Sequence, residues 1–340
     1  MKRVLVTGGA GFIGSNFIRY IMERYDYAVV NLDKLTYACN LDNLRDVADD
    51  SRYRFVQGDI CDPDAVQAAM AGCDAVVNFA AESHVDRSLI DPGAFIQTDV
   101  HGVFVLLDAA RRLGVERFLH ISTDEVYGPR FPESPALETD ILAPANPYAA
   151  SKAGGEMQCQ AFFRTYGLPV LVSRSANNIG PRQHPEKAVP LFVTNALDDQ
   201  PLPVYGEGLQ VRDRLYVDDN CEALDLILHK GVPGEAYNVG ADNERSNIEV
   251  AETILRLVGK PRSLIRFVED RTNHDARYSV DASKVRALGW RPRHDFDAAL
   301  AKTVAWYRDN RWWWEKVKSG EYAAYYQRQY GDRLAKSRGL

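Results

Sequence analysis

A tyrosine and a lysine four residues apart, Tyr148 and Lys152, are the first residues whose types and spacing suggest chemistry. We predict a helix over residues 147–167, and a spacing of four on a helix places both side chains on one face. A lysine ammonium beside a phenol stabilises the phenolate and lowers the pKa of the phenol. Such a tyrosine can take a proton from a substrate hydroxyl near neutral pH. The pair is a catalytic candidate only if its surroundings agree, because exposed Tyr/Lys pairs are also common on helices.

Three polar residues, Thr123, Asp124 and Glu125, directly follow a strand predicted at residues 115–121. Ligands of open parallel sheets bind at the carboxyl ends of the strands, so we expect these side chains to face a substrate. Adjacent residues of an extended chain point in different directions, so both carboxylates reach one ligand only if the chain turns there. A pair of solvated acids is the alternative interpretation. His84, which follows another strand, is interpreted as a packed or hydrogen-bonded loop histidine and not as a base.

A glycine-rich turn near the start of the chain predicts a dinucleotide site. Gly8, Gly11 and Gly14 lie between a predicted strand at residues 2–7 and a predicted helix at residues 12–24. Glycines in this position let the backbone turn tightly and approach a pyrophosphate, which binds at the N-terminus of the helix. The strand before the glycines and the helix after them make this pattern more specific than the glycines alone.

An acidic residue ends the second predicted strand, at residues 28–33. Asp33 lies 25 residues after Gly8, close to the distance expected for a carboxylate that binds a ribose 2′-hydroxyl. A carboxylate there repels a 2′-phosphate, so the sequence favours NAD over NADP as the cofactor. Asp59 and Ile60 follow the third strand, where a loop can contact the adenine.

The order of the elements predicts an α/β fold, a Rossmann-type doubly wound parallel sheet with a smaller mixed α/β C-terminal substrate lobe. Five strand–helix units precede residue 150, which is typical of such a sheet. We expect an NAD-binding domain at residues 1–175, with later segments near 213–240 returning to it. Residues 176–330 are expected to form mainly the substrate lobe, and the tail from Trp312 to cover that lobe.

Composition excludes several classes of protein. The 340 residues carry a formal net charge of −6, which argues against a general nucleic-acid binder. No apolar run is long enough to span a membrane, and the first strand begins too early for a signal peptide. The five cysteines show no metal-binding spacing, so we expect no metal, reduced thiols and a cytoplasmic location.

Several motifs together resemble a known family. The segments TGGAGFIG, STDEVYG and YAASK resemble the extended short-chain dehydrogenase/reductase superfamily. More narrowly, FAAESHVDRS, NPYAASKAG, PLPVYGEG and VRDRLYVDD resemble the nucleotide-sugar 4,6-dehydratases, above all the subgroup that acts on dTDP-glucose. The resemblance extends from residue 2 to beyond residue 320.

The resemblance implies a mechanism for the polar residues. Tyr148, helped by Lys152 and Thr123, would take the proton of the C4 hydroxyl while a hydride passes from C4 to NAD⁺. Glu125 would remove the C5 proton, and Asp124 would protonate the departing C6 hydroxyl. Return of the hydride to C6 would give a 4-keto-6-deoxy sugar. Two neighbouring carboxyl groups must then hold different protonation states, which like-charge repulsion and unequal burial can supply.

The resemblance also assigns contacts by position. The residues that match NAD contacts are Gly8, Gly11, Phe12, Ile13, Gly14, Asp33, Lys34, Thr36, Asp59, Ile60, Ala81, Thr98, Tyr148, Lys152 and Asn178. The residues that match substrate contacts are Ser83, Thr123, Asn177, Lys187, Tyr205, Arg212, Asn247, Arg271 and His274. Arg212 suits a diphosphate because its planar fork binds phosphate oxygens, and Tyr205 can stack on a pyrimidine. An ion pair of Arg212 with Asp213 is the alternative.

The chain departs from the family pattern mostly in the substrate lobe. The departures are Ile179, Arg182, His184, Arg214, Asn220, Thr272 and Asn273. They leave open the same reaction on another nucleotide sugar, such as UDP-glucose. A 4-epimerase or decarboxylase would not need Asp124 and Glu125, and a non-catalytic nucleotide-sensing or RNA-binding scaffold is a further alternative. The resemblance finally implies a homodimer through helices near residues 100–113 and 148–166.

Overall fold

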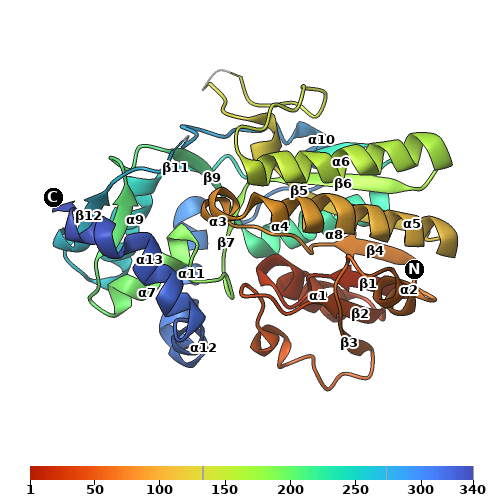
Figure 1. Cartoon of the computed structure of the whole chain (residues 1–340), viewed down its shortest axis with the longest axis horizontal. Helices are drawn as coiled ribbons and strands as arrows, with labels where there is room; N and C mark the ends of the chain where they lie inside the picture. Colours follow the sequence, from red (N-terminus) through yellow and green to blue (C-terminus); the bar gives the residue numbers. More distant parts are fainter. Residues whose placement is uncertain (132–133, 273, 340) are drawn as a thin grey trace.

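Seven parallel strands form the central sheet, in the order β10-β6-β5-β4-β1-β2-β3 (Figure 1). This computed structural model describes residues 1–131, 134–272 and 274–339. The strands are β1 (Arg3–Thr7), β2 (Ala28–Asp33), β3 (Tyr53–Gln57), β4 (Ala75–Asn78), β5 (Arg117–Thr123), β6 (Val170–Ser175) and β10 (Ala236–Val239). Since each strand is joined to a parallel neighbour through crossovers that carry helices, the predicted doubly wound sheet is confirmed.

Helices cover both faces of this sheet. They are α1 (Phe12–Arg24), α2 (Pro63–Met70), α3 (Val85–Ile90), α4 (Pro92–Ile96), α5 (Val103–Leu113), α6 (Pro147–Tyr166), α8 (Val217–Lys230) and α10 (Ser283–Ala287), with a π-helical turn (Gln97–Gly102) between α4 and α5. Side chains alternate along β1, so this strand contributes to a hydrophobic core on each face of the sheet. Val4 and Val6 pack with α1 and α8, whereas Leu5 packs with α2, α5 and α6 on the opposite face.

A smaller mixed lobe lies at the carboxyl edge of the sheet, as expected. It has two three-stranded sheets with the orders β11-β9-β7 and β13-β12-β8. Its strands are β7 (Asn177–Ile179), β8 (Leu202–Tyr205), β9 (Val211–Tyr216), β11 (Glu244–Ser246), β12 (Ile265–Val268) and β13 (Arg338–Gly339). Its helices are α7 (Ala188–Leu197), α9 (Asn247–Val258), α11 (Phe296–Asp309), α12 (Arg311–Val317) and α13 (Glu321–Ala335). Figure 1 shows this lobe at the left, beside the central sheet.

The described residues also form three short 3₁₀ helices, at Leu41–Leu44, Asp124–Tyr127 and Arg262–Leu264. Among the described residues, no helix has the length and apolar character needed to cross a membrane. All five cysteines are free thiols, as the sequence predicted.

The C-terminal tail packs on the smaller lobe, as predicted. Trp313 and Trp314 are buried with side chains of α7, α9 and α11, whereas Trp312 is 48% exposed. The indole Nε1 of Trp313 donates to Asn43 Oδ1 at 2.9 Å, and Asn43 Nδ2 donates to the carbonyl of Ala10 at 2.9 Å. Helix α12 therefore supports the glycine-rich turn through one buried asparagine.

Replacing Trp313 by phenylalanine tests this support. Trp313→Phe leaves the buried Asn43 oxygen without its donor, so we expect the free energy of unfolding to fall by about 1–3 kcal/mol. Urea denaturation measures it, with Trp312→Phe as the matched control. The control is expected to change the free energy of unfolding by no more than about 0.5 kcal/mol. Equal losses in the two variants would contradict the role given to the indole donor.

Candidate active site

The glycine-rich turn forms one wall of a cavity of about 280 Å³. Gly8 has a φ of +67°, and a Cβ placed on it would lie 2.5 Å from the backbone nitrogen of Ala80. A Cβ on Gly14 would lie 2.5 Å from the carbonyl oxygen of Gly8. Both positions therefore require glycine, and the turn brings the N-terminus of α1 to the cavity.

The same cavity brings together all fifteen residues that the sequence matched to cofactor contacts. Asp33, at the end of β2, accepts the backbone N–H of Ala10 at 2.9 Å and that of Leu35 at 2.8 Å. Lys34 and Asp59 form an ion pair at 2.6 Å beside it. Backbone donors thus fix the Asp33 carboxylate at the cavity wall.

Thr123, Asp124 and Glu125 lie at the end of β5, where the chain enters the 3₁₀ helix Asp124–Tyr127. This is the turn that two convergent carboxyl groups require. The Thr123 hydroxyl donates to Asp124 Oδ1 at 3.2 Å and accepts the backbone N–H of Glu125 at 3.3 Å. Glu125 Oε2 accepts Asn146 Nδ2 at 3.4 Å. The hydroxyl of Tyr278 lies 3.3 Å from the same oxygen but makes its shorter hydrogen bond to Asp275.

Asp124 has the opposite environment. It is 2% exposed, and its Oδ2 has no hydrogen-bond partner in the described part of the chain. Burial, followed by the charge of Glu125, raises the pKa of Asp124 to about 8. With its pKa raised in this way, we expect Asp124 to hold a proton at neutral pH, next to a glutamate that accepts a hydrogen bond from Asn146.

Tyr148 and Lys152 share one face of α6 and line the cavity, as predicted. The predicted lowering of the tyrosine pKa is wrong for the chain by itself. Burial, followed by the charges of Glu125 and Asp99, raises the pKa of Tyr148 well above its ordinary value. Lys152 donates to the carbonyl of Ile121 at 2.7 Å, and burial lowers the pKa of the lysine as well. Desolvation outweighs the attraction that the spacing alone suggested.

A second cavity of about 160 Å³ adjoins the first, and both are lined by Glu125, Asn177 and Lys187. Seven of the residues matched to substrate contacts line it: Asn177, Lys187, Tyr205, Arg212, Asn247, Arg271 and His274. The other two, Ser83 and Thr123, line the first cavity. The structure thus brings all nine around two adjoining spaces that meet at the catalytic candidates.

The suggested ion pair of Arg212 with Asp213 is absent from the described residues. Arg212 donates to the carbonyl of Asp275 at 2.8 Å, and its guanidinium lies 4.3 Å from the ring centre of Tyr278. Asp213 instead accepts backbone N–H groups, among them that of Ala241 at 2.7 Å. The guanidinium therefore faces the second cavity without a carboxylate partner.

The departures from the family pattern are distributed unevenly. Ile179 and Arg214 line the second cavity, and His184 lines the first. Arg182 instead donates to Asn16 Oδ1 of α1 at 3.4 Å. Asn220 Oδ1, on α8, accepts the hydroxyl of Ser175 at 2.9 Å. Arg214 donates to Asn247 Oδ1 at 2.7 Å, so this departure touches a residue matched to substrate binding. Thr272 lies in the loop after β12, and Asn273 lies outside the described residues.

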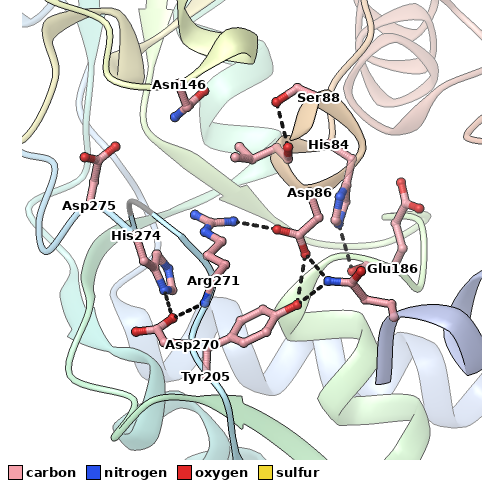
Figure 2. A network of polar contacts seen from close by, with 12 residues as sticks. His84, Asp86, Ser88, Asn146, Glu186, Tyr205, Asp270, Arg271, His274 and Asp275 are labelled. Carbon is pink, nitrogen blue, oxygen red and sulfur yellow. Dashed lines mark hydrogen bonds and ion pairs between the residues drawn. The ribbon is translucent and has the colours of Figure 1, made fainter. Parts of the chain in front are cut away.

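Asp86 is a site residue that sequence reasoning missed. It lies on α3 and accepts Arg271 Nη1 at 3.1 Å and the Tyr205 hydroxyl at 3.0 Å, two groups that line the second cavity (Figure 2). The feature of the sequence that could have indicated Asp86 is its position shortly after the end of β4. His84 is packed as predicted, with its Nε2 3.3 Å from the carbonyl oxygen of Glu186.

Comparisons with known proteins agree with this geometry. Residues 5–303 match the family model described as GDP-mannose 4,6 dehydratase. A dTDP-glucose 4,6-dehydratase of Neisseria meningitidis serogroup B is 49% identical, over 95% of this chain and 98% of that protein. The low-salt glycan biosynthesis protein of Haloferax volcanii is 51% identical, over 89% and 98%.

Solved structures show the same arrangement of elements. DesIV, a dTDP-glucose 4,6-dehydratase of Streptomyces venezuelae solved with NAD bound, has a TM-score of 0.91 and 48% identity, over 93% of this chain and 100% of that one. A UDP-glucose 4-epimerase of Thermus thermophilus, in complex with NAD, has a TM-score of 0.84 and 31% identity, over 91% and 99%.

The protonation of Asp124 predicts how stability depends on pH. Its pKa rises from 3.8 to about 8 on folding, so in this range the folded chain binds a proton that the unfolded chain releases. The free energy of unfolding therefore falls as pH rises through this window, by at most about 1.4 kcal/mol per pH unit. Asp124→Asn removes this contribution.

Urea denaturation between pH 4 and pH 9 measures the effect. The stability of the natural chain relative to Asp124→Asn is expected to decrease from about pH 4 to about pH 8 and then to level off. The exposed Asp49→Asn serves as the control and should follow the natural chain. A constant difference between Asp124→Asn and the natural chain would show that Asp124 is ionised throughout.

Proposed function

Because the chain belongs to the GDP-mannose 4,6-dehydratase family, we propose that it is an NAD-dependent dTDP-glucose 4,6-dehydratase. It converts dTDP-glucose to dTDP-4-keto-6-deoxyglucose and water. The observation that carries the proposal is the buried pair of adjacent carboxyl groups, Asp124 and Glu125, in which Glu125 accepts a hydrogen bond from Asn146 and Asp124 Oδ2 has no partner among the described residues. Relatives named dTDP-glucose 4,6-dehydratase, at 45–50% identity over more than 90% of this chain, support the choice of dTDP-glucose.

The first cavity fits NAD. Gly8 and Gly14 leave room for a pyrophosphate where a Cβ would not fit, and the N-terminus of α1 favours its negative charge. Each Asp33 oxygen accepts one backbone N–H and keeps a lone pair for a ribose hydroxyl. The other cavity residues matched to NAD complete the site. When bound, the nicotinamide supplies a reversible hydride acceptor for C4 and a hydride donor for C6.

Tyr148 accepts the proton of the C4 hydroxyl. Its raised pKa in the chain alone means that positive charge must stabilise the phenolate. Lys152, on the same face of α6, and the cationic nicotinamide ring both act in this direction. The Thr123 hydroxyl lies at the same end of β5 and completes the group around O4.

Glu125 and Asp124 carry out the elimination of water. Oxidation at C4 acidifies the C5 proton, which Glu125 accepts. The C5–H electrons form the C5=C6 double bond, the C6–O bond breaks, and the proton of Asp124 leaves with the hydroxyl as water. Burial and the neighbouring Glu125 raise the pKa of Asp124, which favours the proton that the departing hydroxyl requires.

The second cavity binds the nucleoside diphosphate. Arg212 and Lys187 contact the phosphates, and the ring of Tyr205 stacks on the base. The remaining contacts in our assignment are Ser83, Asn177, Asn247, Arg271 and His274. We divide the chain into an NAD-binding domain at residues 1–175, to which later segments of about residues 213–240 return, and a region at residues 176–330 that forms mainly the substrate lobe.

A 4-epimerase shares the fold and the cofactor cavity but has no step for the carboxyl pair. The buried, protonated Asp124 costs stability at neutral pH, as its raised pKa shows, and only an elimination uses it. This cost favours the dehydratase over the epimerase.

The purified protein, incubated separately with dTDP-glucose and UDP-glucose, tests the proposal by mass spectrometry. We expect the loss of one water from dTDP-glucose, and little or none from UDP-glucose. Loss of water only from UDP-glucose would contradict the assigned base. Inversion at C4 without loss of water would contradict the dehydratase.

Glu125→Gln is the matched variant for this assay. It retains the hydrogen-bond geometry but cannot accept the C5 proton. Dehydration should fall by about 10²- to 10⁴-fold, while the absorbance of reduced nicotinamide still appears when substrate is added. Full dehydration by this variant would show that Glu125 is not the base.

The enzyme is a homodimer in our proposal, and the free thiols fit a cytoplasmic location. Helix α4, the π-helical turn, α5 and α6 pack side by side and carry exposed apolar side chains, among them Ile96, Phe104 and Met157. A second copy can cover this face in a four-helix bundle. Sedimentation should give twice the mass of the chain, and Phe104→Glu should shift it towards the mass of one chain. A natural chain that sediments as a monomer would contradict the dimer.

A further inference from the structure

The hydroxyl of Tyr205 is held by three side chains. It donates to Asp86 Oδ2 at 3.0 Å, and it accepts Gln329 Nε2 at 2.6 Å and Arg333 Nη1 at 3.0 Å. These contacts use the single proton and both lone pairs of the hydroxyl. Tyr205 therefore offers its ring, and not its hydroxyl, to a ligand in the second cavity.

Asp86 connects this tyrosine to an arginine on the other side of the cavity. It is 5% exposed, and its Oδ1 accepts Arg271 Nη1 at 3.1 Å while its Oδ2 also accepts Gln329 Nε2 at 3.1 Å. Figure 2 shows Asp86 between Arg271 and Tyr205, which come from separate segments of the chain. One carboxylate thus contacts two groups that line the same cavity.

Two of the three partners of the Tyr205 hydroxyl come from the C-terminal helix. Gln329 and Arg333 lie on α13, beyond residue 303, where the match to the family model ends. Tyr330 of the same helix lines the second cavity, and its ring centre lies 6.0 Å from that of Tyr205. The rings of His274 and Tyr205 are perpendicular, with their centres 5.9 Å apart. The orientation of Tyr205 is therefore set by elements far apart in sequence.

We propose that Asp86 and Gln329 are positioning residues that hold the Tyr205 ring as a preformed stacking surface for the base of a pyrimidine nucleoside diphosphate. This rests on the proposed function, because it assumes that the second cavity binds the nucleotide. A ring fixed before binding loses less rotational freedom when the base arrives, so affinity is gained without a new contact to the ligand. Asp86 also holds the guanidinium of Arg271 in place beside the same ligand.

Calorimetric titration of the NAD-loaded protein with dTDP tests the inference. Gln329→Ala removes one hydrogen bond of the Tyr205 hydroxyl and should weaken dTDP binding about 3- to 10-fold, whereas Tyr205→Phe removes all three and should weaken it at least as much. Asp86→Asn should weaken it more, and should raise the KM for dTDP-glucose by a larger factor than it lowers kcat. The exposed Gln327→Ala, two residues away on α13, is the matched control and should bind dTDP like the natural chain.

The double variant Tyr205→Phe/Gln329→Ala separates positioning from a structural role. If Gln329 acts through the hydroxyl, the double variant binds dTDP no more weakly than Tyr205→Phe. A further loss in the double variant, or unchanged dTDP binding in Tyr205→Phe and Gln329→Ala, would overturn the inference while the proposed function stands. A natural chain that binds neither dTDP nor UDP would overturn both. Urea denaturation of each variant shows whether it is folded.

Discussion

Two adjacent carboxyl groups, Asp124 and Glu125, are buried at the end of β5. Ionising both of them at the same time costs free energy. Like charges at this distance in a poorly solvated site repel each other, and burial disfavours each charge separately. Glu125 receives a hydrogen bond from Asn146, whereas Asp124 Oδ2 has no hydrogen-bond partner within the described residues. The proton then resides on Asp124. The short 3₁₀ helix that follows β5 brings Glu125 to the wall of both cavities, whereas Asp124 lines neither of them.

The cationic side chains of the second cavity are subject to a different constraint, the loss of their solvation. Lys187 and Arg212 donate to backbone carbonyls, and burial lowers the pKa of Lys187. Burial and the neighbouring Arg212 lower the pKa of Arg214 to about 9. Several cationic side chains thus line one cavity, where burial makes their charged forms less favourable. A diphosphate supplies the negative charge that these groups lack, which accords with a nucleotide-sugar substrate.

Local patterns were sufficient to predict the central sheet and the cofactor cavity. The glycine spacing, the acid at the end of β2 and the alternation of strands and helices act over short distances in sequence, and all fifteen matched residues line the first cavity. The pKa of Tyr148 was not predictable, because spacing shows that a lysine is near but not that the surroundings desolvate both groups. Asp86 and Gln329 are 243 residues apart, and their contact exists only because α13 folds back over the smaller lobe.

The protonation state of Asp124 is the central claim, and infrared spectroscopy tests it most directly. A protonated carboxyl group has a carbonyl stretching band that a carboxylate lacks. The difference spectrum between the natural chain and Asp124→Asn should contain this band at neutral pH, and the band should disappear as pH rises past about 8. A difference spectrum that shows only a carboxylate at neutral pH would contradict the account. It would mean that the two adjacent acids are both ionised and that the leaving hydroxyl takes its proton from another group.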